Sequence, residues 1–154
     1  MIRKVSPTRS LSHPVIWSAA WIAMLLVAMT NGLVRDLTYG RQMDALLAHQ
    51  LSTLSGCVLL GGVIRFFVRR WPPASSRQAL AAGLGWMVTT IAFEFVFFHF
   101  VGGHSWAALL ANYNLFAGRV WVLLLLWIAI APAVFFRLQA PKRSSTLNRQ
   151  AFPR

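Results

Sequence analysis

The chain has 154 residues, of which 57% are hydrophobic and 12% are charged, whereas about a quarter of the residues of a soluble domain carry a charge. This composition excludes a water-soluble globular domain. Fifteen Lys and Arg stand against three acidic residues, but they flank apolar runs without interleaved base-stacking aromatics, which argues against a nucleic-acid partner. The single cysteine, Cys57, excludes an intramolecular disulfide and a Cys-x-x-Cys redox pair.

Four long apolar runs follow one another along the chain, and each predicts a membrane-spanning helix. An α-helix rises 1.5 Å per residue, so about 20 residues cross the hydrocarbon core of a bilayer. The first run is too long for the apolar core of a signal peptide and no small-x-small cleavage site follows it, so we interpret it as a span. We predict spans at about residues 14–34, 45–68, 79–101 and 115–136.

A shorter helix is predicted between the third and fourth spans. Ser105 suits an N-cap, apolar and aromatic residues recur at helical spacing from Trp106 to Tyr113, and Asn112 and Asn114 suit the helix end. This helix is either an aromatic anchor in the membrane interface, which we favour, or a lid over polar groups. The predicted fold class is therefore all-α: a polytopic membrane protein with a four-transmembrane-helix bundle and a short interfacial helix.

Lys and Arg are distributed unevenly between the two sides of the predicted bundle. The N-terminal segment, the loop after the second span and the C-terminal tail hold three, four and five of them, whereas the first and third connections hold Arg35, Arg41 and Arg119. Because positively charged loops stay in the cytoplasm, both termini are predicted to be cytoplasmic. The chain then divides into a cytoplasmic segment at 1–13, a transmembrane domain at 14–138 and a basic cytoplasmic tail at 139–154.

Two partners follow from this arrangement, the lipid bilayer around the spans and anionic lipids at the basic loop and tail. Small residues recur every fourth position on the second and third spans, which allows close approach between helices within the bundle. A homo-oligomer or a larger membrane complex is compatible with this pattern. The small residues are Ala48, Ser52 and Gly56 on the second span, and Ala81, Gly85 and Thr89 on the third.

Polar residues gather in the outer halves of the predicted spans, on the side opposite the termini. The inner halves contain few polar groups besides Thr89, Thr90 and Arg65. Such one-sidedness is typical of a polar pocket that opens to that side. The predicted cluster, which either binds a ligand or has a structural role, consists of Arg35, Asp36, His49, Gln50, Glu94, His99, His104 and Arg119.

Glu94 is the most informative member, because a membrane-buried acid costs several kcal/mol unless it is neutral or paired. Arg119 is expected about one turn inside the same boundary, on a neighbouring span. We therefore predict an ion pair between Glu94 and Arg119, with Arg35 as the alternative partner. Such a pair either fixes helix packing or serves a function, and the sequence favours neither interpretation.

The histidines are candidate ligands of a transition metal or of haem. His49, His99 and His104 are expected at a similar depth, and His49 and His99 would form the bis-histidine haem pair. They lack the tight spacing of metal motifs such as His-Glu-x-x-His, so hydrogen bonding to backbone or water is the favoured interpretation. No hydrolase, Walker or zincin motif is present, and we predict no enzymatic activity.

Several of these segments together resemble a pattern found in small four-helix bacterial inner-membrane proteins with no known activity. The resemblance covers most of the four-span region and implies a fold and a bacterial inner membrane, but no activity. The segments are Arg35-Asp36, Ala48-His49-Gln50-Leu51-Ser52, Phe93-Glu94-Phe95 with His99, Gly102-Gly103-His104-Ser105-Trp106, Leu109-Leu110-Ala111-Asn112-Tyr113-Asn114 and Gly118-Arg119-Val120-Trp121.

Three hypotheses for function follow from the sequence. The leading one is a non-enzymatic membrane protein whose outer polar cluster binds a small ligand or ion, or holds a partner subunit. The alternative is a membrane haem or metal protein that transfers electrons and uses His49 and His99 as ligands. In a third, the chain is an accessory subunit in which the cluster only holds helices together.

Overall fold

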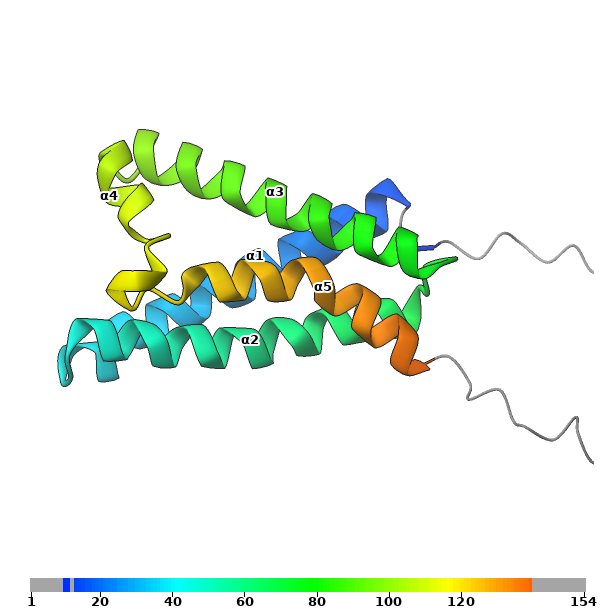
Figure 1. Ribbon diagram of the computed structural model, residues 1–154, viewed down its shortest axis with the longest axis horizontal. Coiled ribbons are helices and arrows are strands. Elements are labelled where there is room, and N and C mark those ends of the chain that lie inside the picture. The colour runs from blue at the N-terminus through cyan, green and yellow to red at the C-terminus, as the bar shows by residue number, and fades with distance from the viewer. Residues whose placement is uncertain (1–9, 12, 140–154) are drawn as a thin grey trace, which may run out of the picture.

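The computed structural model describes residues 10–11 and 13–139, which are almost entirely helical (Figure 1). Predictions for residues 1–9 and 140–154 lie outside this range. The elements are α1 (Pro14–Leu37), η1 (Tyr39–Arg41), α2 (Ala45–Arg70), α3 (Ser76–Phe100), α4 (Trp106–Ala111), η2 (Leu115–Ala117) and α5 (Trp121–Gln139), where η denotes a 3₁₀ helix.

The predicted four-helix bundle with a short fifth helix is confirmed. The first three spans end within three residues of the predicted limits, and α4 begins directly after Ser105, as expected. The start of the fourth span was predicted wrongly, because α5 begins at Trp121 and not near residue 115. The chain first forms η2 and then turns at Gly118, whose φ of 76° is a left-handed conformation that favours glycine.

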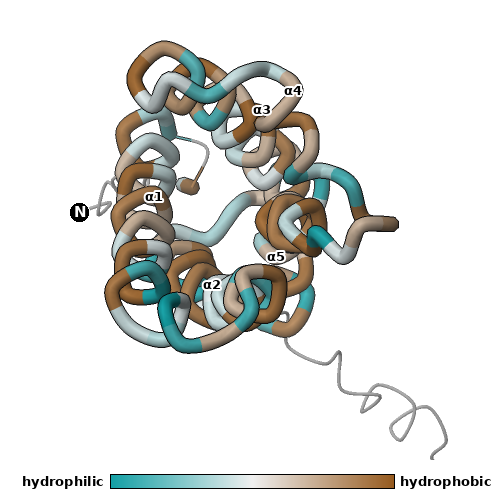
Figure 2. Tube along the Cα trace, turned by 90° about the vertical axis from the view of Figure 1, so that its left-hand side faces the viewer, coloured by the Kyte–Doolittle hydropathy of each residue, from teal (hydrophilic) through white to brown (hydrophobic). Residues whose placement is uncertain are grey.

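The four long helices follow the order α1, α2, α5, α3 around the bundle, as the end-on view in Figure 2 shows. The start of α1, the turn between α2 and α3 and the end of α5 lie at one end, which we call the terminal end. The other end carries η1, α4 and η2, and we call it the α4 end (Figure 1). Hydrophilic residues colour the loops of the α4 end in Figure 2.

Local capping determines where several helices begin. The carboxylate of Asp44 accepts hydrogen bonds from the backbone N–H groups of Leu46 and Leu47, at 2.9 and 3.1 Å, and so starts α2. The hydroxyls of Ser75 and Ser105 cap α3 and α4 in the same way. These caps satisfy backbone groups that would otherwise lack partners near the membrane interface.

The apolar core occupies the half of the bundle nearest the terminal end. All four long helices contribute to it, and Trp86 at its centre is fully buried. In this half α3 and α5 come into backbone contact, since a Cβ on Gly83 would lie 2.1 Å from the carbonyl oxygen of Ala129. The buried residues include Ile16, Ala20, Met24, Leu60, Ile64, Val68, Ala82, Trp86, Leu124, Ile128 and Ala131.

The small-residue prediction is confirmed on α2 and holds only in part on α3. Ala48, Ser52 and Gly56 of α2 are all buried. On α3, Ala81 is exposed, and the buried small residues are Ala79, Ala82 and Gly83 instead. α3 approaches the backbone of α5 at Gly83, whereas Gly85 of the predicted series lies against Trp17 of α1.

Tryptophans join helices that are separated in the sequence. The indole N–H of Trp17 donates to the carbonyl of Ala82 at 3.2 Å, and that of Trp86 donates to the carbonyl of Trp17 at 3.1 Å. Trp21 donates to the Thr90 hydroxyl at 3.1 Å, so three indole bonds link α1 to α3. Trp127 of α5 donates to the carbonyl of Cys57 on α2 at 2.9 Å. An indole suits such a contact between helices inside a membrane, because it combines a large apolar ring with a single N–H donor.

All four long helices are long and apolar enough to cross a bilayer. Between 17% and 39% of the most apolar window of each helix is buried inside the bundle, so most of this apolar surface faces outward. Exposed residues such as Leu54, Val58 and Val88 would be unfavourable in contact with water. The chain is therefore an integral, multi-pass membrane protein.

Candidate functional site

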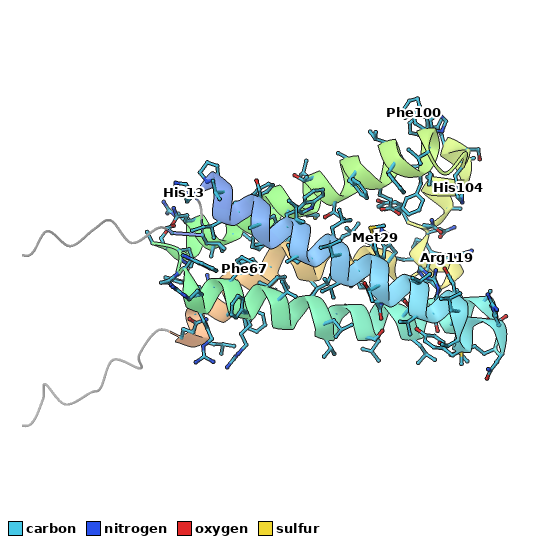
Figure 3. All side chains as sticks on the ribbon, turned by 180° about the vertical axis from the view of Figure 1, so that it is seen from behind. His13, Met29, Phe67, Phe100, His104 and Arg119 are labelled. Atoms are coloured by element: carbon cyan, nitrogen blue, oxygen red, sulfur yellow. The ribbon has the colours of Figure 1, made fainter. Side chains whose placement is uncertain are left out.

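The polar residues singled out in the sequence lie mainly toward the α4 end. Figure 3 shows His104 and Arg119 at this end and His13 at the opposite one. The α4 end does not form one network, however. Its polar side chains divide into a carboxyl group held by α3, α4 and α5, a basic group shared by α1, α2 and the segment before α5, and several separate hydrogen bonds.

Glu94 is buried on α3, with 8% of its surface exposed. Its Oε2 accepts a hydrogen bond of 2.7 Å from the Tyr113 hydroxyl and one of 2.9 Å from the indole N–H of Trp121. The predicted ion pair with Arg119 is wrong, and so is the alternative with Arg35, since neither arginine lies within 4.0 Å of this carboxyl group. The neutral hydrogen-bond donors Tyr113 and Trp121 satisfy the buried carboxyl group instead of an arginine.

Tyr113 reaches Glu94 from the turn that follows α4. Burial, and then the neighbouring Glu94, raise the pKa of the Tyr113 phenol. The phenol therefore stays protonated and acts as a hydrogen-bond donor. The interfacial helix is thus tied to the third span through a buried polar contact as well as through aromatic packing of Phe95 against Tyr113 and Trp106.

Arg119 has a different environment from the predicted one because it precedes α5. Its Nη1 makes one hydrogen bond, of 3.4 Å, to the side-chain oxygen of Asn112. The guanidinium is half-buried and, among the described residues, no carboxylate lies within 4.0 Å of it. Most of its five N–H donors are therefore left without a protein partner.

His49 lies on α2 within reach of the positive charges of Arg119 and Arg35. Its Nε2 atom is buried and has no hydrogen-bond partner in the described part of the chain. Such an unsatisfied atom is uncommon, because leaving it unpaired costs about 1–3 kcal/mol. We call Arg35, His49 and Arg119 the basic cluster.

Arg35 is the member of the basic cluster with a charged partner. Its Nε donates to the carboxylate of Asp36 at 2.8 Å, and the Nε of Arg41 donates to the Asp36 carbonyl at 3.0 Å. The Asp36 side chain is largely exposed, so its charge is screened by solvent. Arg35 thus has a partly screened carboxylate as its partner, whereas no carboxylate of the described residues lies within 4.0 Å of His49 or Arg119.

Two further sets of polar contacts hold α2 in place. Asn31 of α1 donates to the carbonyl and hydroxyl of Ser52, at 2.8 and 3.1 Å, and accepts a 2.8 Å hydrogen bond from Ser55. Gln50 donates to the carbonyl of Gly118 at 3.1 Å. The side chains of Asn31 and Gln50 therefore have hydrogen-bond partners within the protein, and their role is to hold neighbouring segments of the bundle together.

His99 and His104 form a separate contact beside α4. The Nδ1 of His99 lies 2.8 Å from the backbone oxygen of His104, and its ring stacks on Trp106 with centroids 3.8 Å apart. Neither ring contacts His49. Within residues 10–11 and 13–139, no group of three His, Cys, Asp or Glu side chains could hold a metal ion.

Sequence reasoning missed the roles of Tyr113 and Trp121. Tyr113 was predicted as part of an aromatic anchor and Trp121 was given no hydrogen-bonding role, although both carry a polar atom that usually finds a partner when buried. The signal that could have identified them was the buried acid Glu94, because neutral hydrogen-bond donors such as Tyr and Trp can satisfy its carboxyl group without a second charge. Comparisons with protein-family models, with curated proteins and with solved structures found no match to this chain.

Proposed function

We propose that the protein belongs to a bacterial inner membrane, that its α4 end faces the periplasm, and that the basic cluster binds a small anion there. The orientation is supported by the charge distribution, because twelve of the fifteen Lys and Arg belong to the N-terminal segment, to the adjoining ends of α2 and α3, and to the chain from Arg137 onward. Reporter domains fused to the two ends should both be found in the cytoplasm. Ends in opposite compartments would refute this orientation.

The single observation behind the anion site is the buried, unpartnered Nε2 of His49, which lies within electrostatic range of Arg119 and Arg35. Arg119 adds unused donors, and among the described residues the Asp36 carboxylate is paired with Arg35 alone. Glu94 contributes no counter-charge within ion-pair distance. An anion with several oxygens would accept hydrogen bonds from His49 and Arg119 and would offset the local excess of positive charge.

Thermal unfolding of the full-length protein in mild detergent tests this proposal. Phosphate or sulfate should raise the melting temperature relative to chloride at equal ionic strength, since a ligand that binds the folded state stabilises it. His49→Ala and Arg119→Gln should abolish the increase. Arg41→Gln removes an arginine at the same end that makes a backbone contact outside the basic cluster, and should retain it.

A second candidate is an accessory subunit in which these side chains only hold helices together. The satisfied contacts of Glu94 and Asn31 favour it for those two residues. If it also holds for the basic cluster, His49→Ala and Arg119→Gln will change the melting temperature equally in chloride and in phosphate. Haem ligation by His49 and His99 has no such support, because His99 is stacked on Trp106 and bound to His104.

A further inference from the structure

A shallow groove runs along the outer face of α2 near the terminal end. Its volume is about 410 Å³, and it is lined by Gly62, Arg65, Phe66, Arg69 and Arg70. All five residues are exposed, and all come from two consecutive turns of one helix. The groove therefore faces the surroundings of the bundle and not its interior.

The arginines of this groove have no carboxylate nearby. The three acidic residues of the whole chain are Asp36, Asp44 and Glu94, at the end of α1, the start of α2 and the second half of α3. All three belong to the α4 half, so no acidic side chain of this chain is available at the terminal end. Among the described residues, no carboxylate thus offers a counter-charge to Arg65, Arg69 and Arg70, and an anionic group of another molecule would supply one.

Aromatic rings position two of these guanidinium groups. Arg65 lies 6.0 Å from the ring centroid of Phe135 on α5, and Arg70 lies 5.0 Å from that of Trp71. Such contacts are favourable for a cation near an aromatic face. Arg65 and Arg69 are one helical turn apart, so their side chains extend from the same face of α2.

Gly62 lies farther from the terminal end of α2 than any of the three arginines of the groove. Arg65 precedes the end of α2 by five residues, which places its backbone about 7 Å inside that end. Gly62 comes one turn earlier and has no atom within 4 Å of a Cβ built on it, which leaves open space. Phe66 adds an apolar ring with 59% of its surface exposed.

We propose that this groove binds an anionic phospholipid, whose phosphate lies between Arg65 and Arg69 while an acyl chain passes Gly62 and Phe66. Arg70 would bind a second phosphate where the lipid carries one. A phospholipid matches the groove because it combines oxygen acceptors at the interface with an apolar chain directly beneath them. This inference concerns the terminal end and does not depend on the proposed anion site at the α4 end.

Native mass spectrometry of the full-length protein, titrated with phosphatidylglycerol in mild detergent, tests the inference. Arg65→Gln and Arg69→Gln should each weaken binding about fivefold, as expected for the loss of one basic residue near anionic lipid. Gly62→Leu should weaken it further by filling the groove, and this side chain meets open space in the bundle. Arg77→Gln on α3, exposed near the same end but outside the groove, is the matched control.

Three results would overturn the inference. Equal weakening by Arg77→Gln would mean that general surface charge attracts the lipid. Equal binding of phosphatidylcholine would remove the requirement for an anionic headgroup, and displacement of the lipid by millimolar inorganic phosphate would identify a soluble anion as the ligand. Unchanged melting temperatures of the variants in detergent verify that the bundle remains folded.

Discussion

The terminal half of the bundle and its α4 half bury different kinds of side chain. In the terminal half, Trp86, Ile64 and Val68 are fully buried, and α3 meets α5 in backbone contact at Gly83. In the α4 half, the contacts are hydrogen bonds, such as those of Glu94 and Asn31. Among the described residues, the terminal half has no buried side-chain nitrogen or oxygen without a hydrogen-bond partner, whereas the α4 half has one such nitrogen and a nearly free guanidinium.

This difference indicates where a ligand could act. A closely packed apolar region changes little without loss of stability. A region held by separate hydrogen bonds offers donors and acceptors that another molecule can use. Substitutions in the closely packed terminal half should therefore lower the free energy of unfolding more than substitutions of hydrogen-bonding residues in the α4 half.

The largest effect is expected at Gly83. Gly83→Ala places a Cβ 2.1 Å from a carbonyl oxygen of α5, so the two helices must separate. We expect a loss of about 3 kcal/mol in the free energy of unfolding, at the upper end of overpacking effects. Gly62→Ala is the matched control, because its Cβ meets open space. Equal stability of the two variants in denaturant titrations would show that α3 and α5 are not in backbone contact.

The next effect is expected at the carboxyl group of α3. Tyr113→Phe removes one of the two donors to Glu94 and should cost about 1–3 kcal/mol, the usual penalty for a buried group that loses its partner. Tyr39→Phe alters the other tyrosine of the chain, at the same end, and should have almost no effect. A double-mutant cycle of Tyr113→Phe with Glu94→Leu should reveal coupling. Additive effects of the two substitutions would show that Tyr113 and Glu94 do not interact.

A smaller effect is expected at the polar contact between α1 and α2. Asn31→Leu removes three hydrogen bonds but places an apolar group in their position, so we expect a loss of about 1 kcal/mol. Thr30→Val is the control, since the Thr30 hydroxyl binds a carbonyl of its own helix. A melting temperature equal to that of the control would show that Asn31 does not join these helices.

The smallest effect is a dependence on alkaline pH. The pKa of Tyr113 is raised in the folded protein, so the folded state holds this proton more tightly than the unfolded state. Stability from this group is fully present below the ordinary tyrosine pKa of 10.0 and falls as the pH rises above it. Unfolding measured on both sides of that pH should show the decrease, and Tyr113→Phe should reduce it. If Tyr113→Phe loses stability to the same extent above this pH, other titratable groups are responsible for the loss.

Much of the fold could be predicted from the sequence, because hydrophobic length and helix caps are local signals. The short helix after Ser105 is one example. The start of α5 was missed because the left-handed turn at Gly118 depends on tertiary contacts. Arg119 was therefore expected inside the fourth span near Glu94, whereas it lies before α5. The close approach of α3 to α5 at Gly83 was not predicted, because this glycine lies outside the small-residue series recognised on that helix and only packing selects it.

The candidate site was predicted less well than the fold. The side chains were assigned to the correct half of the bundle, but their partners were not, since partner choice depends on positions that a linear sequence does not specify. His99 and His104 contact each other and not His49. Tyr113 and Trp121, which donate hydrogen bonds to Glu94, were not predicted as its partners.

The central claim, that the α4 end presents an anion site on the side opposite the termini, can be tested without knowing the ligand. A His49→Cys variant, with the single native cysteine removed by Cys57→Ala, is treated with membrane-impermeant thiol reagents of opposite charge. The account predicts reaction from the side opposite the termini, faster with the anionic than with the cationic methanethiosulfonate, and loss of this preference in Arg119→Gln. Reaction from the side of the termini alone, or an equal rate with the cationic reagent, would contradict it.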